Sequence, residues 1–229
     1  MEKIKKNIFC SGHDCFKDDY FNSNLSNGNI THLTYKNLSV EQNPNIIYSF
    51  NKLINYLKPR RVLEIGTFAG GLTLLIRDIL DYNELYNSDV ITYDVVTPNY
   101  LINQISEIKI ISKTKNLFSD NYEDFQDETS KNEIFNLIQK EGVTLVLCDG
   151  GSKKNEFKLI TPLLKKGDVI MAHDYSSNEE YFNFNVKNKY WNWMEIQDSD
   201  IIDVVNKNNL TPCLQEDFNN VAWVCKIKY

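Results

Sequence analysis

One stretch limits the choice of fold more than any other, namely RVLEIGTFAGGLT at positions 61–73. Its apolar run is short and ends sharply at Gly66, as buried parallel strands do. Beyond the glycines, apolar residues recur at helical spacing, at positions 72, 75, 76, 79 and 80. The stretch therefore predicts a strand, a tight glycine turn and an amphipathic helix, which together open a Rossmann-like α/β fold.

The spacing of the glycines indicates which ligand the turn binds. The chain has neither the G-x-G-x-x-G of dinucleotide folds nor the G-K-[ST] of phosphate loops here. The pattern is Glu64-x-Gly66-x-x-x-Gly70, which resembles the first motif of class I S-adenosylmethionine (SAM) methyltransferases. A carboxylate at position 64 would repel a diphosphate, whereas it tolerates a cofactor with an amino group and a sulfonium.

We therefore predict that this turn binds SAM. Its backbone N–H groups lie at a helix N-terminus, and glycines let a ligand approach the main chain closely. The alternative is a glycine turn that only packs a helix on a sheet. The predicted cofactor-binding residues of the turn are Glu64, Gly66, Thr67, Phe68, Gly70 and Gly71.

Length and composition fit one α/β domain. With 229 residues and 42% hydrophobic content, the chain has enough material for a single core. We expect this domain over residues 44–229 and an N-terminal arm or cap over residues 1–43, which are polar and lack periodicity. Two readings stay open, a cap over the site anchored by Phe16, Tyr20, Phe21 and Tyr35 and, for the first fifteen residues, an unanchored leader.

The charge and the apolar runs exclude several classes of partner. A net charge of −6, with no arginine-rich run to offset it, argues against nucleic acid. No apolar run approaches the roughly 18 residues of a membrane helix, and the first residues lack the apolar core of a signal peptide. The five cysteines form no CxxC pair, which argues against a disulfide framework. We expect a cytoplasmic protein, and whether it forms a homo-oligomer is left open.

The strand expected at residues 89–94 ends in a carboxylate. Asp94 lies 24 residues after Gly70 (94 − 70), close to the spacing of about 20 at which Rossmann-like units place a ribose-binding acid. Asp94 is therefore predicted to bind the cofactor ribose, and the alternative is a solvated loop residue. Phe118, in a polar turn at 115–120, is expected either to stack on the adenine or to fill the core.

Periodicity predicts the other elements. Helices are expected at 46–57, 99–106, 133–140, 157–164 and 199–205, and strands at 108–112, 143–148, 168–172, 210–214 and 221–227. A polar segment at 215–220 is expected to join the last two strands. Trp191 and Trp193 are expected either to line an acceptor pocket or to belong to the core.

Two further strands run directly into acidic residues. The strand at 143–148 is followed by Asp149, and the strand at 168–172 by His173 and Asp174. In an open parallel sheet the carboxyl ends of the strands share one edge, so these side chains are expected beside the glycine turn. Two carboxylates at close range raise each other's pKa unless a cation lies between them. This favours a divalent metal with oxygen ligands, with Mg²⁺ preferred.

These motifs together resemble a family. Glu64-x-Gly66, Asp149-Gly150 and the segment LKKGDVIMAHD at 164–174 resemble metal-dependent O-methyltransferases of the catechol O-methyltransferase type. The closer resemblance is to the bacterial group of cephalosporin hydroxylase-like and rhamnosyl O-methyltransferase proteins, which share the Gln-x-Pro segment at 42–44 and a late Trp-rich stretch. It extends over residues 38–229. It implies a seven-stranded, mostly parallel sheet with an antiparallel last strand and helices on both faces.

The resemblance also implies roles for individual residues. Asp149 and Asp174 match metal ligands, and His173 stands where the group has an acidic ligand, which puts the third ligand in doubt. Lys153 is near the position of a general base, although its offset from Asp149 is imperfect. The predicted catalytic residues are thus Lys153, Asp149 and His173, and the metal ligands are Asp149, His173 and Asp174. Asp149 is also predicted to bind the cofactor. Alternatives are a solvated Lys153 and a His173 that hydrogen-bonds to backbone.

The function expected from the sequence is a SAM-dependent, divalent-metal-assisted O-methyltransferase. Its acceptor is expected to be a small hydroxylated molecule, with a saccharide or natural product favoured over a catechol. Alternatives are a metal-independent N- or C-methyltransferase and a SAM-binding module without catalysis, with a dehydrogenase as a more distant one.

Overall fold

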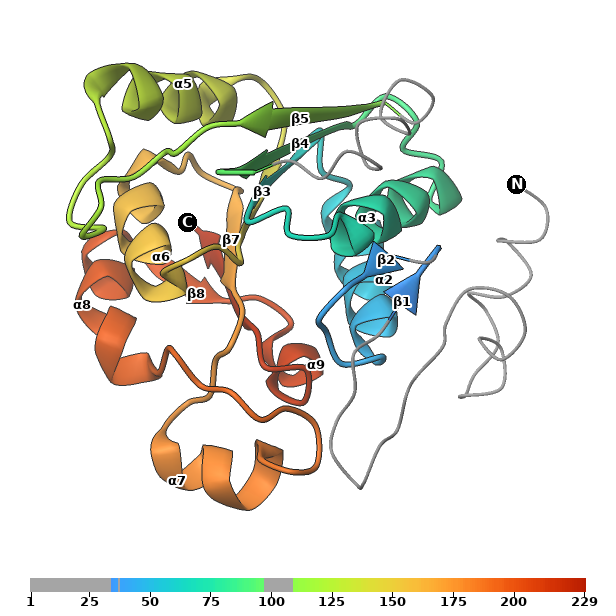
Figure 1. The fold of residues 1–229 in the computed structure, drawn as a ribbon, viewed down its shortest axis with the longest axis vertical. Helices are drawn as coiled ribbons and strands as arrows, with labels where there is room; N and C mark the ends of the chain where they lie inside the picture. Colours follow the sequence, from blue (N-terminus) through green and yellow to red (C-terminus); the bar gives the residue numbers. More distant parts are fainter. Residues whose placement is uncertain (1–33, 37, 97–108) are drawn as a thin grey trace.

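Seven strands form the central sheet of the computed structural model, in which residues 34–36, 38–96 and 109–229 are described. Their order is β5-β4-β3-β6-β7-β9-β8, and β9 runs antiparallel to β7 and β8 while the other pairs are parallel (Figure 1). This confirms the Rossmann-like sheet with an antiparallel last strand. The bounds are β3 (Arg61–Ile65), β4 (Asp89–Asp94), β5 (Ile110–Thr114), β6 (Thr144–Cys148), β7 (Val169–Ala172), β8 (Leu210–Pro212) and β9 (Val224–Lys228).

Helices cover both faces of the sheet, with α2 and α3 on one side and α5, α6 and α8 on the other (Figure 1). The main helices are α2 (Ile46–Leu57), α3 (Gly71–Tyr82), α5 (Glu128–Gln139), α6 (Lys153–Ile160) and α8 (Asp198–Lys207). Shorter helical segments are η2 (Thr161–Leu163), α7 (Glu179–Tyr181), η3 (Phe182–Val186) and α9 (Gln215–Asn219). The helix expected at 99–106 lies outside the described residues.

Strand β6 illustrates how the sheet joins the two helical layers. Leu145 and Leu147 pack with α2 and α3, whereas Val146 and Cys148 pack with α5, α6 and α8. Successive side chains of a strand point to opposite faces, so a strand covered on both faces must be apolar throughout. All four side chains are fully buried, which explains the unbroken apolar run in the sequence.

The register of the sheet brings the strand ends together. Ile65 of β3 pairs with Tyr93 of β4 and with Cys148 of β6, and Cys148 pairs in turn with Ala172 of β7. The residues that follow these positions therefore emerge at one edge. The sequence expectation that Glu64, Asp94, Asp149 and Asp174 share this edge agrees with the observed topology.

Two glycines of the turn make room for the protein's own backbone. A Cβ at Gly66, which has a φ of +91°, would lie 2.2 Å from the carbonyl oxygen of Asp149. A Cβ at Gly71 would lie 2.4 Å from the carbonyl oxygen of Ser39. Both positions thus require glycine for chain packing, a reason that differs from the ligand approach expected from the sequence.

The described part of the N-terminal arm packs against α3. Strands β1 (Thr34–Tyr35) and β2 (Leu38–Ser39) form an antiparallel pair. The Tyr35 hydroxyl donates a hydrogen bond to Asp78 of α3, and the Lys36 ammonium lies 2.6 Å from the same carboxylate. Tyr35 thus anchors the segment, whereas the other expected anchors, Phe16, Tyr20 and Phe21, lie outside the described residues.

Several predicted boundaries are wrong for identifiable reasons. The polar link at 215–220 contains α9, because its Phe218 is fully buried against Phe50 and Trp223. Helix α5 starts at Glu128 rather than 133, since Asp127 caps it by accepting a 2.6 Å hydrogen bond from the Ser130 N–H. Strand β5 is shifted to 110–114, and the capping residue of α8 is Gln197 rather than Ser199.

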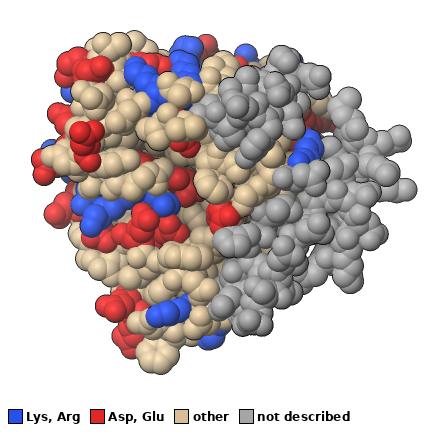
Figure 2. Space-filling model, in the orientation of Figure 1, with Lys and Arg blue, Asp and Glu red and all other residues tan. Residues whose placement is uncertain are grey.

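The described surface carries mixed charge. On the face that Figure 2 shows, basic side chains lie beside acidic ones. None of the helices in the described ranges is long and apolar enough to cross a membrane.

Candidate functional site

A cavity of about 330 Å³ opens at the carboxyl edge of the sheet. Its volume is within the range of small-molecule sites. Four strand ends or the loops after them contribute to its wall. The lining residues include Gly66, Phe68, Asp94, Phe118 and Asp149, all of which the sequence predicts as cofactor-binding.

Asp94 organises the glycine turn. Its carboxylate accepts hydrogen bonds from the backbone N–H groups of Phe68, at 2.8 Å, and Val96, at 3.2 Å. Phe68 has a φ of +46°, an uncommon conformation for a residue other than glycine, and its side chain is 60% exposed. The Asp94 hydrogen bond thus holds the turn in a strained conformation at the mouth of the cavity.

Glu64 is buried beneath the same turn, with 1% of its surface exposed. One carboxyl oxygen accepts a 2.5 Å hydrogen bond from the Thr73 hydroxyl, while the other is buried without a partner among the described residues. Burial raises the pKa of Glu64 to about 8, although the hydrogen bond from Thr73 acts in the opposite direction. An unpaired buried carboxyl oxygen fits the amino group of a cofactor such as SAM.

The remaining turn residues predicted from the sequence have structural contacts. The hydroxyl groups of Thr67 and Thr92 lie 2.7 Å apart, which ties the turn to β4. Gly70 has a φ of +81° and immediately precedes α3. Phe118 is buried and packs against Tyr122 and Phe125, which is the core role considered for it, and it also lines the cavity.

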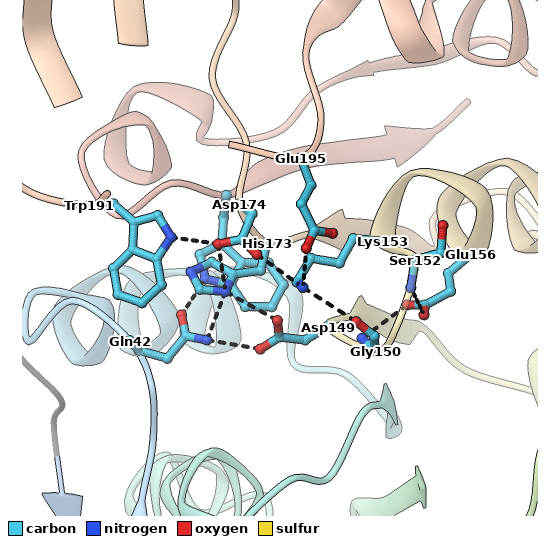
Figure 3. Close-up of polar contacts among 11 residues, drawn as sticks. Gln42, Asp149, Gly150, Ser152, Lys153, Glu156, His173, Asp174, Trp191 and Glu195 are labelled. Atoms are coloured by element: carbon cyan, nitrogen blue, oxygen red, sulfur yellow. Dashed lines mark hydrogen bonds and ion pairs between the residues drawn. The ribbon is translucent and has the colours of Figure 1, made fainter. Parts of the chain in front are cut away.

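Asp149, His173 and Gln42 form a polar cluster next to the cavity, in which Gln42 and His173 are buried and Asp149 is partly buried (Figure 3). The Gln42 amide donates a 2.8 Å hydrogen bond to one Asp149 oxygen, and Nδ1 of His173 lies 3.1 Å from the other. The Trp223 indole N–H donates to the Gln42 carbonyl oxygen at 2.8 Å, which fixes the amide orientation. The His173 ring lies 4.9 Å from Trp223 and 4.7 Å from Trp191, centroid to centroid.

Asp174 and Lys153 extend this cluster (Figure 3). Gln42, Asp149, Lys153, His173 and Asp174 together are called the charged cluster below. The Lys153 ammonium lies 3.0 Å from Oδ2 of Asp174, and Oδ1 accepts a 2.5 Å hydrogen bond from the Trp191 indole. The Glu195 carboxylate lies 3.4 Å from the same ammonium. Asp174 has a φ of +56°, so this strand end is held in the left-handed region by the contacts around it.

The environment of Lys153 keeps it protonated. Burial alone would lower its pKa, but the charges of Asp149, Asp174 and Glu195 outweigh that effect and raise the pKa well above its usual value. A general base must give up its proton near the working pH. The geometry therefore does not support the base role predicted for Lys153, because the ammonium is stabilised as a cation.

The three predicted metal ligands lie close together but do not form a metal site. Both oxygens of Asp149 and both oxygens of Asp174 already lie at hydrogen-bond distance from protein donors. No group of three or more His, Cys, Asp or Glu side chains within the described ranges is arranged to hold a metal ion. The donor set does not fit a metal in this arrangement, since Lys153 supplies the positive charge.

Sequence reasoning missed several residues of the site. Gln42 falls within the segment predicted as an arm, and Trp223 and Glu195 follow no recognisable pattern. Glu156 of α6 is also buried at the cavity and accepts hydrogen bonds from the N–H groups of Gly150, at 3.1 Å, and Ser152, at 3.0 Å. Burial raises the pKa of Glu156 to about 7 against the effect of these hydrogen bonds. Only the Gln-x-Pro segment gave a signal for Gln42.

The two late tryptophans have different environments. Trp191 is buried against His173 and Asp174, whereas Trp193 is 52% exposed and lies 5.1 Å from the Trp191 ring, centroid to centroid. The Trp191 side chain therefore packs against the charged cluster and is part of the buried interior. Trp193 presents an aromatic surface next to it.

No protein-family model and no curated protein sequence matches the chain. A solved structure of CmcI with Mg and SAM matches with a TM-score of 0.55 and 13% identity, over 96% of this chain and 86% of that chain. A CmcI structure with SAH matches with a TM-score of 0.55 and 11% identity, over 96% and 93%. An O-methyltransferase family protein from Burkholderia thailandensis matches with a TM-score of 0.52 and 12% identity, over 80% and 55%. At identities this low, the likeness is one of fold.

Proposed function

We propose that this chain, which has the fold of the class I SAM-dependent methyltransferases, is an O-methyltransferase acting on a small hydroxylated acceptor. The observation that carries the proposal is that the cavity and the polar cluster around His173 and Lys153 share part of one wall. Asp149 and Gly150 line the cavity beneath the glycine turn. Asp149 also contacts His173, and the Gly150 carbonyl oxygen also contacts the Lys153 ammonium. A methyl donor in the cavity would thus lie beside groups able to bind an acceptor hydroxyl.

Three side chains each make one contact with the cofactor. The Asp94 carboxylate binds the ribose hydroxyls, since it lies at the cavity wall. The unpaired oxygen of Glu64 accepts a hydrogen bond from the amino group. Phe118, which lines the cavity while it packs in the core, lies against the adenine.

SAM supplies an electrophilic methyl group: the acceptor oxygen forms the new C–O bond as the C–S bond breaks, and the electron pair of that bond passes to sulfur. Asp149 and Lys153 hold the acceptor hydroxyl by hydrogen bonds, and the hydroxyl proton leaves to water. The protein mainly provides positioning of the methyl donor and the acceptor oxygen.

The acceptor is proposed to be a saccharide or a related hydroxylated natural product. Trp193 offers an exposed aromatic surface, and the Glu195 side chain is partly exposed beside Lys153. Sugars present an apolar face for stacking and hydroxyl groups for hydrogen bonds, which matches this combination. No step of the proposal depends on the divalent metal expected from the sequence.

Calorimetric titration of the purified protein with SAM, SAH and NAD tests the cofactor. Binding of SAM and SAH but not of NAD supports the proposal, and binding of NAD alone contradicts it. Transfer of a labelled methyl group from SAM to a panel of saccharides, phenols, amines and carbon acids then tests the reaction. Labelling of hydroxyl acceptors is expected. Labelling of amines or carbon acids alone favours the alternative methyltransferases, and SAM binding without any labelling favours a non-catalytic module.

A further inference from the structure

The Lys153 ammonium occupies a position built for a cation. Its Nζ lies 3.0 Å from Asp174, 3.4 Å from Glu195 and 3.3 Å from the carbonyl oxygen of Gly150 (Figure 3). These oxygens come from three separate segments, namely the end of β7, the loop before α8 and the loop after β6. Only 11% of the Lys153 side chain is exposed. An ammonium enclosed by oxygens from three segments resembles a bound cation rather than a surface lysine.

The neighbouring carboxylates are oriented by fixed donors. Asp174 accepts from the Trp191 indole and Asp149 from the Gln42 amide, and Gln42 is itself fixed by Trp223. A divalent ion would have to displace the ammonium from Asp174, which loses a buried ion pair. The local chemistry therefore favours the internal cation over an external one.

We propose that the Lys153 ammonium takes the place of the divalent cation, so that methyl transfer by this chain does not depend on a metal. The inference rests on the proposed function. The ammonium exchanges its 3.4 Å contact with the partly exposed Glu195 for a hydrogen bond to the acceptor oxygen, and it stabilises the negative charge of that oxygen while the hydroxyl proton leaves to water. Because Gly150 both binds the ammonium and lines the cofactor cavity, the acceptor oxygen is held next to the methyl group.

Mn²⁺ binding measured by electron paramagnetic resonance tests the inference without requiring an acceptor. The native protein is expected to show no saturable Mn²⁺ binding at millimolar concentration. Lys153→Ala is expected to acquire such binding, because the carboxylates of Asp174 and Glu195 lose their internal cation, and Asp174→Asn in the same background should remove it. Lys154→Ala is the matched control, since the Lys154 ammonium lies 3.4 Å from Asp200, outside the cluster. Saturable binding to the native protein, or no gain in Lys153→Ala, overturns the inference.

Lys153→Arg keeps the charge and covers the case in which the alanine variant does not fold. It should retain the native lack of Mn²⁺ binding, and binding by this variant would count against the inference. Once an acceptor is known, methyl transfer should persist unchanged after chelator treatment and should not rise with added Mg²⁺. Activity abolished by chelator refutes the internal cation while leaving the methyltransferase function intact. Absence of any SAM binding refutes the proposed function and leaves the Mn²⁺ result interpretable on its own.

Discussion

Gly66 lies so close to Asp149 that a Cβ at position 66 would be 2.2 Å from the Asp149 carbonyl oxygen. This contact joins the end of β3 to the end of β6, and it is reinforced by the 2.9 Å hydrogen bond from the Asp149 N–H to the Ile65 carbonyl. The glycine turn and the carboxylate of the charged cluster are therefore one structural unit. A change at either position is expected to disturb both halves of the site.

Gly66→Ala should destabilise the protein strongly. The positive φ of +91° costs about 1–2 kcal/mol for alanine, and the backbone collision adds about 1–3 kcal/mol. Gly167→Ala is the matched control, because Gly167 has a φ of +89° but its Cβ would meet no atom closer than 4.0 Å. Urea unfolding should show a loss of about 1–2 kcal/mol for the control and a clearly larger loss for Gly66→Ala. Equal losses would mean that the collision is relieved without cost.

The buried Glu64 should make stability depend on pH. Its pKa is raised from 4.5 to about 8, so the folded state keeps a proton that the unfolded state loses over this window. Stability should therefore fall as pH rises between 4.5 and about 8, by at most about 1.4 kcal/mol per pH unit, and the contribution should be constant outside that window. Glu64→Gln should remove this slope in unfolding experiments across the range. Parallel curves for the native protein and the variant would contradict the assignment.

Asp94→Ala should weaken SAM binding. The substitution removes the carboxylate that holds the Phe68 N–H at 2.8 Å, together with its proposed contact to the ribose. Loss of a charged hydrogen-bonding partner corresponds to about 1.5–3 kcal/mol, or roughly a ten- to hundredfold rise in Kd. Asp89→Asn, at the other end of β4 and exposed, is expected to bind SAM as the native chain does. Calorimetry on both variants decides the matter, and a native Kd for Asp94→Ala would exclude the ribose role.

Trp193→Ala should raise the KM for a saccharide acceptor by roughly fivefold, as expected from the loss of one aromatic contact. The kcat should change little, because a stacking surface binds the ground state and the transition state equally. Phe135→Ala on α5 removes another exposed aromatic ring that is not part of the charged cluster, and it serves as the control. Steady-state kinetics separate the two parameters. A fall in kcat at unchanged KM would place Trp193 outside the acceptor site.

Local sequence determined much of the fold. The apolar run, the sharp stop at Gly66 and the helical spacing that follows specify a strand, a turn and a helix, because each feature depends only on neighbouring residues. The acidic residues at the strand ends were also predictable, since parallel strands share one carboxyl edge. Asp94 and Asp149 accordingly lie at one cavity. Boundaries that depend on burial, such as the helix formed around Phe218, were not predictable from local pattern.

Only the tertiary structure decided what the charged cluster is. Gln42 reaches Asp149 across 107 positions of sequence and Trp223 across 181, distances at which periodicity carries no information. The sequence placed Lys153 near the carboxylates but could not determine its charge state, because that depends on burial and on Asp174 and Glu195 packing around the ammonium. Hydrophobic pattern fixes which elements form, whereas the pairing of buried charges is set by the fold that brings them together.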